Sequence, residues 1–221
     1  LGAGSGRVTA ALARAGFNVV ALERSAAMSG RARSRLAAAG LAERVRFVQD
    51  DMRGFRSGER YPLVIAPFNA FMHLHSLADQ DATLANARAQ LEPGGAFALD
   101  LYNPNFAALE RLKLEREWQQ SALEGLGDGT SELFVYQRCD PERQLLESRY
   151  YLDTTDAEGR LTRRTARLEQ RYFTRFELER ALRQAGFARL RFYGDFERGP
   201  YRQAAPQLVA VARVESEPPG E

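Results

Sequence analysis

The chain has 221 residues, of which 44% are hydrophobic and 27% are charged, a composition typical of a globular domain. Its formal net charge of +2 gives no support for a nucleic-acid partner. The single cysteine, Cys139, excludes an intrachain disulfide and a multi-cysteine metal site, so we assign no metal ligands. We expect a cytoplasmic protein without a membrane partner, built as one domain or one domain with a large insertion.

The chain opens on a glycine-rich stretch in which residues 2, 4 and 6 are glycines. Residues 7–15 carry apolar side chains at helical spacing, and Gly16 closes the predicted helix. The apolar run 17–22 then predicts a strand that ends at Glu23. A glycine turn lets the backbone approach a ligand closely, and an acid after the next strand can bind a ribose diol. The pattern predicts a site for a nucleoside-containing cofactor; a tight turn without a ligand is the alternative.

A second predicted helix covers residues 26–39 and ends at Gly40, and a strand is predicted over residues 45–49. Asp51 and Met52 follow that strand at its carboxyl end. In open α/β sheets ligands bind outside the carboxyl ends of the strands, so Asp51 is predicted to share an edge with Glu23. The alternative for Asp51 is a solvated loop acid.

The next predicted strand covers residues 61–66, where Pro62 is tolerable near the strand's start. Residues 67–74 follow at the same edge of the sheet. An amphipathic helix is predicted over residues 78–91, a turn over 92–95, and a strand over 96–102.

The character of the sequence changes beyond Pro104. The predicted elements there are a helix at 105–118, a break at 125–129, and strands at 131–138, 145–154 and 160–172 with a hairpin turn at 156–159. The strands alternate charged and apolar residues, which indicates an antiparallel sheet with one solvated face. Thr174 and Glu177 form a capping box that begins another helix, and strands are predicted at 189–196 and 207–214.

Several ordered features over about residues 1–102 resemble the class I S-adenosylmethionine (SAM)-dependent methyltransferases of small-molecule type. They are the G-x-G-x-G turn, the acid at position 23, the Asp51-Met52 pair, the segment after residue 66, and the L-x-P-G-G sequence that begins at Leu91. Dinucleotide enzymes have G-x-G-x-x-G/A, and Arg7 stands where their third glycine would be. The resemblance implies an α/β fold with a doubly wound, mostly parallel, seven-stranded Rossmann-like sheet and an antiparallel β insertion.

The resemblance also implies a domain organisation. The SAM-binding core would cover residues 1–104 and 173–214, the antiparallel insertion residues 105–172, and a tail residues 215–221. The insertion would serve as a lid, a substrate contact or an oligomer contact, so a homodimer is one arrangement to consider. Because the family has a strand just before the glycine turn, we expect most of that strand to lie upstream of Leu1.

Candidate cofactor-binding positions follow from the family's motifs, with the Asp51 carboxylate accepting from the adenine amino group and Met52 packing on the ring. These positions are Gly2, Ala3, Gly4, Ser5, Gly6, Glu23, Arg24, Met28, Asp51, Met52, Ala66, Pro67 and Phe68. His73 is a candidate general base, because a histidine with a near-neutral pKa suits proton removal from an amine or hydroxyl; a packing or hydrogen-bonding role is the alternative. Phe71, Tyr102 and Asn103 are candidate substrate contacts, with core packing or a structural role as the alternative for each.

The predicted function is methyl transfer from SAM to a nitrogen or oxygen atom of a small molecule. The cofactor supplies the electrophile in such a reaction, and the protein supplies orientation and electrostatics, so no nucleophilic side chain is required. Two alternatives remain: a SAM- or nucleotide-binding module without catalysis, and an NAD-dependent oxidoreductase, against which the position of Arg7 argues.

Overall fold

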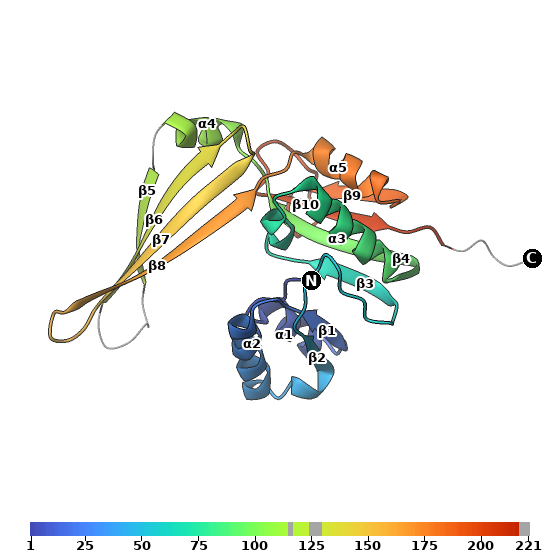
Figure 1. Ribbon diagram of the computed structural model, residues 1–221, viewed down its shortest axis with the longest axis horizontal. Helices are drawn as coiled ribbons and strands as arrows, with labels where there is room; N and C mark the ends of the chain where they lie inside the picture. The colour runs from blue at the N-terminus through green and yellow to red at the C-terminus, as the bar shows by residue number, and fades with distance from the viewer. Residues whose placement is uncertain (115–116, 124–129, 217–221) are drawn as a thin grey trace, which may run out of the picture. The chain divides into compact units, whose positions relative to one another are not determined.

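The structure, a computed structural model, describes residues 1–114, 117–123 and 130–216 (Figure 1). The chain divides into two compact units. The core unit comprises Leu1–Asn103 and Thr174–Glu221, and the sheet unit comprises Pro104–Phe173. The predicted break at 125–129 and residues 217–221 of the predicted tail lie outside the described residues.

The core unit has a mixed α/β fold. Its helices are α1 (Arg7–Arg14), α2 (Ala26–Ala38), α3 (Leu77–Ala89) and α5 (Arg175–Gln184), with short 3-10 helices η1 (Ala42–Arg44) and η2 (Ala70–His73). Its strands are β1 (Val19–Leu22), β2 (Val45–Val48), β3 (Tyr61–Ala66), β4 (Leu91–Tyr102), β9 (Arg189–Tyr193) and β10 (Gln207–Arg213). The alternation of strands and helices through β4 agrees with the predicted α/β class.

The strands of the core unit form two sheets. β1 and β2 pair in parallel, and a second sheet has the order β3-β4-β10-β9, with β3 and β4 parallel and the last three strands antiparallel. The backbone N–H of Ala3 donates to the carbonyl of Leu22 at the end of β1, and the amine of Leu1 donates to the carbonyl of Ile65 in β3. The first residues of the chain therefore bond to one strand from each sheet.

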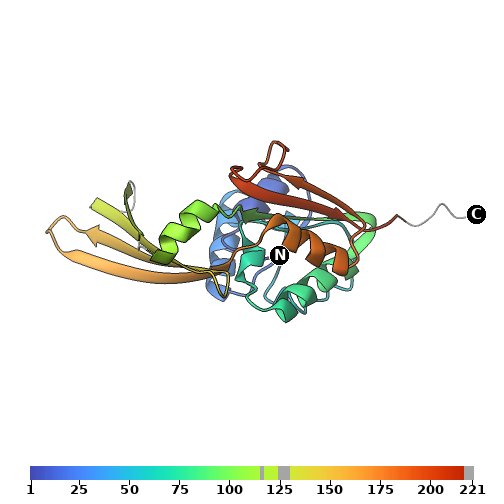
Figure 2. The ribbon, with the colours of Figure 1, turned by 90° about the horizontal axis from the view of Figure 1, so that it is seen from above.

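Helices α3 and α5 lie side by side against the four-stranded sheet (Figures 1 and 2). Leu84 of α3, Leu178 and Leu182 of α5 and Phe97 of β4 are completely buried. A smaller apolar cluster joins Ala10 and Ala13 of α1 to Leu36 of α2, with Val45 and Phe47 of β2 packed against it. These two cores fix the carboxyl ends of β1, β2, β3 and β4, where the predicted site residues lie.

The predicted turn at 92–95 is wrong, because these residues belong to β4. Tyr61 pairs with Leu91 and Leu63 pairs with Ala96, so residues 92–95 face Pro62 alone as a large bulge. Proline has no N–H to donate to a ladder, which lets the opposing strand bulge at that point. The predicted helix at 78–91 accordingly ends at Ala89.

Local signals for turns and caps agree with the structure at the start of α5. The Thr174 side chain accepts from the backbone of Glu177, and the Glu177 side chain accepts from the backbone of Thr174, which confirms the predicted capping box. None of the helices in the described parts of the chain combines the length and the apolarity that crossing a membrane would need.

The sheet unit contains α4 (Phe106–Leu114) and an antiparallel sheet in chain order. Its strands are β5 (Glu117–Leu123), β6 (Thr130–Asp140), β7 (Leu145–Thr155) and β8 (Leu161–Arg171). The predicted helix at 105–118 is wrong at its end, and β5 was not predicted, because pairing with β6 overrides local helix propensity there. The buried carboxylate of Glu147 in β7 contacts the guanidinium groups of Arg138, Arg149 and Arg167, which lower its pKa despite burial.

Candidate functional site

The glycine turn adopts a left-handed backbone. Gly2, Gly4 and Gly6 all have positive φ, and Gly6 with φ 77° is the N-cap of α1. A Cβ on Gly6 would lie 2.9 Å from the Cβ of Ala32, so the third glycine permits close packing of α1 against α2. This packing directs the backbone of Gly4 toward the end of β1.

Glu23 follows β1, and its carboxylate is held by the main chain on both sides. Oε2 accepts the backbone N–H of Gly4 at 2.8 Å, and Oε1 accepts the backbone N–H of Ser25 at 2.8 Å. Each carboxylate oxygen can accept two hydrogen bonds, so a second acceptor position remains on each. The glycine turn therefore orients an acid that suits recognition of a vicinal diol.

Asp51 lies after β2 and is held by arginine side chains and by the backbone N–H of Arg53, which donates to its Oδ1 at 3.0 Å. Its Oδ1 accepts Nε of Arg53 at 2.9 Å, and its Oδ2 accepts the NH2 nitrogen of Arg53 at 2.8 Å. Arg53 also donates to Asp79 in the first turn of α3 at 2.8 Å, and Arg24 lies 3.6 Å from Asp51. The hydrogen bonds from Arg53 lower the pKa of Asp51 to about 2, so this carboxylate is charged at neutral pH.

Residues 67–69 form a strained corner after β3. Phe68 and Asn69 have φ of 55° and 59°, the left-handed region that side chains rarely adopt. The Phe68 N–H donates to the buried carboxylate of Asp100 in β4 at 2.9 Å, and the Asn69 N–H donates to the Asp100 carbonyl at 3.2 Å. Burial raises the pKa of Asp100 against the effect of these N–H groups. The corner leaves the Phe68 side chain exposed.

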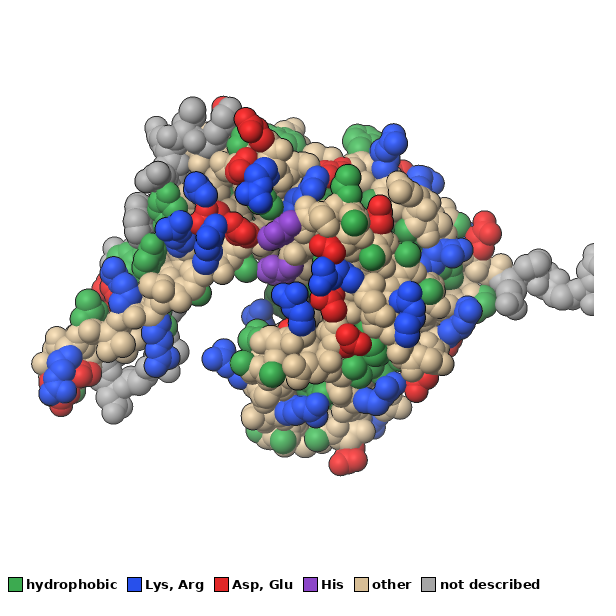
Figure 3. Space-filling model, viewed as in Figure 1, with side chains coloured by type: hydrophobic (Ala, Val, Ile, Leu, Met, Phe, Trp, Pro, Cys, Tyr) green, Lys and Arg blue, Asp and Glu red, His purple; other side chains and the backbone are tan. Residues whose placement is uncertain are grey.

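His73 ends η2 and faces the same space. Its side chain is accessible, and both histidine side chains are visible at the surface in Figure 3. Desolvation by the surrounding protein atoms lowers the pKa of His73 below its usual 6.5, and His75 adds to that effect. The imidazole is therefore largely neutral at pH 7 and able to accept a proton.

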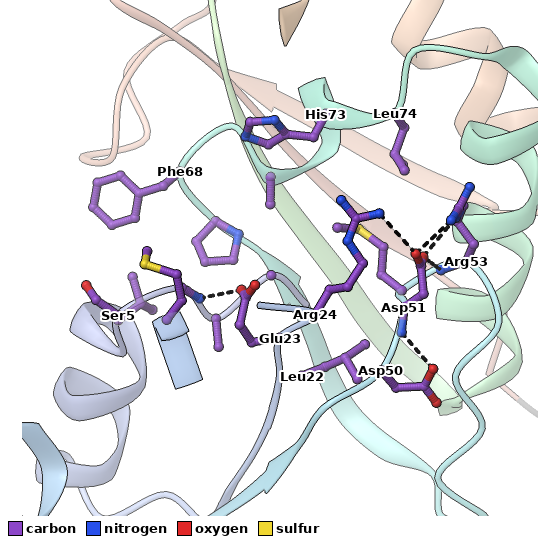
Figure 4. Close-up of a pocket in the computed structure, with 18 of the residues that line it drawn as sticks. Ser5, Leu22, Glu23, Arg24, Asp50, Asp51, Arg53, Phe68, His73 and Leu74 are labelled. Carbon is purple, nitrogen blue, oxygen red and sulfur yellow. Dashed lines mark hydrogen bonds and ion pairs between the residues drawn. The ribbon is translucent and has the colours of Figure 1, made fainter. Parts of the chain in front are cut away.

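These segments converge on one pocket of about 400 Å³, a size that small-molecule sites commonly have (Figure 4). Glu23 stands near its middle, with Ser5 and Phe68 on one side and Asp51 and Arg53 on the other. The predicted residues that line it are Gly2, Ala3, Gly4, Ser5, Glu23, Arg24, Met28, Asp51, Met52, Pro67, Phe68 and His73. The predicted residues in the pocket wall thus come from four segments of the core unit.

Five of the predicted site residues do not line the pocket. Gly6 packs against Ala32, and Ala66 is completely buried in β3. Phe71 is also completely buried. The side chain of Asn103 donates to three backbone carbonyls at 202, 203 and 205 and accepts from the Tyr201 hydroxyl, so its polar atoms serve the loop before β10. Tyr102 lies outside the pocket wall too.

The structure adds eight wall residues that the sequence reading did not assign to the site. They are Arg7, Val8, Leu22, Asp50, Arg53, Ala70, Leu74 and Asp79. Arg53 stands two positions after Asp51, so both lie on one loop. This spacing was a signal by which Arg53 could have been predicted as a site residue. Asp79 carries no such local signal, because only the packing of α3 brings it to the pocket.

The pocket residues are suited to binding a ligand rather than to nucleophilic attack by a side chain. Two carboxylates and a glycine turn suit a nucleoside, and an aromatic ring and a neutral imidazole also line the pocket. Within the described ranges, no group of histidine, cysteine and acidic side chains is arranged to hold a metal ion.

Comparison with known proteins agrees with this geometry. A family model described as a methyltransferase domain matches residues 1–95. A protein-L-isoaspartate O-methyltransferase of Methylorubrum extorquens is 36% identical over 113 residues, which are 51% of this chain and 44% of that protein. The chain thus spans less than half the length of the curated relatives it matches.

Two solved structures are similar over nearly the whole chain. The CcbJ methyltransferase from Streptomyces caelestis has a TM-score of 0.77 and 26% identity, with 97% of this chain and 82% of that chain covered. The glycopeptide N-methyltransferase MtfA, solved with S-adenosyl-L-homocysteine, has a TM-score of 0.63 and 25% identity, with 97% and 79% covered.

Proposed function

Because this chain belongs to the class I SAM-dependent methyltransferases, we propose that it transfers a methyl group from SAM to a nitrogen or oxygen atom of a small molecule. The observation that carries the proposal is the convergence of the glycine turn, Glu23 and Asp51 on one pocket. If these residues were far apart, they could not bind one ligand. In one pocket, the two acids can bind the ribose hydroxyls and the adenine amino group of an adenosine.

In this proposal Glu23 accepts the two ribose hydroxyls, because its outward acceptor positions remain available beside Gly4 and Ser25. Asp51 accepts from the adenine amino group through the remaining position on Oδ2, near which Arg24 now lies at 3.6 Å. Met28 and Met52 supply apolar surface to the pocket wall. SAM brings the electrophilic methyl group when bound.

A nitrogen acceptor is the preferred form of the proposal. The glycopeptide N-methyltransferase covers 97% of this chain, whereas the isoaspartate O-methyltransferase match covers 51%, so the former includes the sheet unit. Neutral His73 then accepts a proton from the attacking amine. If a His73→Ala variant keeps its turnover within a few-fold of the wild-type value, His73 is not the general base.

Two structural predictions belong to the same proposal. The parallel pair β1-β2 and the sheet β3-β4-β10-β9 are parts of one seven-stranded sheet, joined by the strand that leads into the glycine turn. The support is that Leu1 and Ala3 bond to β3 and to β1. Residues 105–172 contribute to acceptor binding or to assembly as a homodimer.

Calorimetric titration of the full protein with SAM, S-adenosyl-L-homocysteine and NADH separates the alternatives. We expect SAM and its demethylated product to bind and NADH not to bind. NADH binding without SAM binding would establish the oxidoreductase alternative instead. SAM binding without methyl transfer to any member of a broad amine and hydroxyl panel would favour a module that binds the cofactor without catalysis.

The methylated atom is identified by labelling. The protein is incubated with methyl-labelled SAM and an amine, hydroxyl or carboxylate acceptor, and the product is then treated with alkali. Alkali hydrolyses methyl esters and releases their label, whereas N-methyl groups stay intact. Retention of label in an amine acceptor supports the nitrogen form. Alkali-labile label would move the assignment to a carboxylate oxygen.

A further inference from the structure

We propose that Arg7 binds the carboxylate at the amino-acid end of SAM and that the Phe68 ring holds its guanidinium in place for this task. The inference rests on the proposed function and assigns a recognition role to a residue outside the glycine motif.

Three arginines line the pocket, and two of them already face an acid. Arg53 pairs with Asp51 and Asp79, and Arg24 lies 3.6 Å from Asp51. Arg7, the first residue of α1, has no carboxylate partner in the described part of the chain. Its charge is therefore available to an anionic group on a ligand.

The position of Arg7 in the pocket identifies that group. Asp51 and Arg53 lie on one side of Glu23, and Ser5 and Phe68 lie on the other (Figure 4). The guanidinium of Arg7 lies 4.4 Å from the centre of the Phe68 ring. A cofactor with its adenine at Asp51 and its ribose at Glu23 extends its amino-acid end toward Phe68 and Arg7. The carboxylate is the only anionic group of SAM.

The backbone conformation of Phe68 leaves its ring exposed and in contact with Arg7. Its φ of 55° is unfavourable for a bulky side chain, and the hydrogen bond from its N–H to Asp100 holds the backbone in that conformation. The ring is 55% exposed, so it does not serve the core. Its face contacts the Arg7 guanidinium, an interaction that reduces the freedom of a long side chain before the ligand arrives.

The test compares two ligands that differ only in the carboxylate: SAM and decarboxylated SAM, which keeps the sulfonium and the amine. We expect the wild-type protein to bind SAM about tenfold more tightly, as one partly exposed charge-assisted contact supplies about that factor. Arg7→Leu should remove the preference and bind decarboxylated SAM as the wild type does. Phe68→Leu should reduce the preference by about threefold.

Arg14→Leu is the matched control, because Arg14 lies in the last turn of the same helix and outside the pocket wall. It should keep the full preference. If Arg7→Leu fails to fold, Arg7→Gln makes the same prediction with a neutral polar side chain. A preference that survives in the Arg7 variant, or a wild type that binds both ligands equally, overturns the inference and leaves the proposed function standing. A wild type that binds neither ligand rejects the proposed function itself.

Discussion

The two acids of the pocket, Glu23 and Asp51, are held in different ways. Glu23 accepts backbone N–H groups from Gly4 and Ser25, so its position depends on the main chain of the glycine turn and of the start of α2. Asp51 accepts the guanidinium of Arg53, which also binds Asp79 on α3. The Glu23 end of the pocket is therefore fixed by backbone N–H groups alone, whereas the Asp51 end combines one backbone N–H, that of Arg53, with a relay of side-chain charges.

The difference has consequences for how each end responds to change. Backbone N–H groups carry no titratable charge and remain in place when neighbouring side chains are replaced. An ion pair with exposed partners weakens with salt and disappears with either partner. We therefore expect the Glu23 end to be sensitive to the glycine turn and the Asp51 end to be sensitive to the charge on Arg53.

The largest effect is expected at Glu23. Glu23→Ala removes the acceptor proposed for both ribose hydroxyls, two charge-assisted hydrogen bonds worth about 1.5 kcal/mol each. The affinity for S-adenosyl-L-homocysteine should fall about 100-fold in calorimetric titration. Glu43→Ala, which removes an exposed acid in η1 outside the pocket wall, is the control and should bind as the wild type does. An unchanged affinity in Glu23→Ala would remove the ribose assignment.

The second effect tests the backbone that holds Glu23. Gly6→Ala forces a left-handed residue and places a Cβ 2.9 Å from the Cβ of Ala32, so we expect about 3 kcal/mol of lost stability in urea unfolding. Gly16→Ala is the matched control. Gly16 also has positive φ, 94°, but has no atom within 4 Å of an added Cβ, so strain alone should cost about 1 kcal/mol. Equal losses at the two glycines would contradict the packing role of Gly6.

The third effect concerns the charge relay. Arg53→Met removes the side-chain hydrogen bonds that are the main cause of the Asp51 pKa of about 2 and keeps the backbone N–H of residue 53, so that pKa should return toward 3.8. Because the folded pKa is depressed, the stabilisation from this carboxylate is complete above pH 3.8 and is lost as pH falls through about 2 in the wild type. In the variant the folded pKa approaches the unfolded value, so this carboxylate should add little stability at any pH. Carbon-detected NMR titration of the Asp51 carboxyl measures both values.

Arg24→Met is the control for this relay. Arg24 approaches Asp51 only at 3.6 Å and contributes least to the lowered pKa, so its loss should move the pKa of Asp51 much less than the loss of Arg53. A wild-type pKa of Asp51 near 3.8 would show that the relay is absent in solution.

The same contrast explains which parts of the site were predictable. The glycine turn, Glu23 and Asp51 are local signals. The turn is recognised from its glycine spacing, and Glu23 and Asp51 each follow a strand that the apolar pattern predicts. Sequence order alone then places them on one edge of the sheet. Asp79 could not be predicted as a site residue from the sequence, because its contact with Arg53 requires α3 to pack beside the loop after β2.

The errors in the fold have a similar cause. The proline and glycines at 93–95 indicate a turn locally, but pairing of β4 with β3 on both sides turns them into a bulge. The first two residues of β5 were assigned to the end of a helix and the rest to no element, because the partner that makes it a strand, β6, lies beyond residue 129. Non-local pairing decided both segments, and a single sequence carries no record of it.

The smallest effect is expected at His73, where no ion pair is involved and the surroundings set the pKa through desolvation. Its pKa should lie below 6.5 in NMR titration of the free protein, and His75→Asn should raise it slightly by removing a nearby like charge.

Because the folded pKa is depressed, the unfolded chain binds the proton more readily. Stability should therefore increase as pH rises through the window just below 6.5. A pKa of His73 above 6.5 would mean that the charge of Glu23, which acts in the opposite direction, outweighs burial. The imidazole would then be increasingly protonated near neutral pH and less suited to accept a proton from an amine.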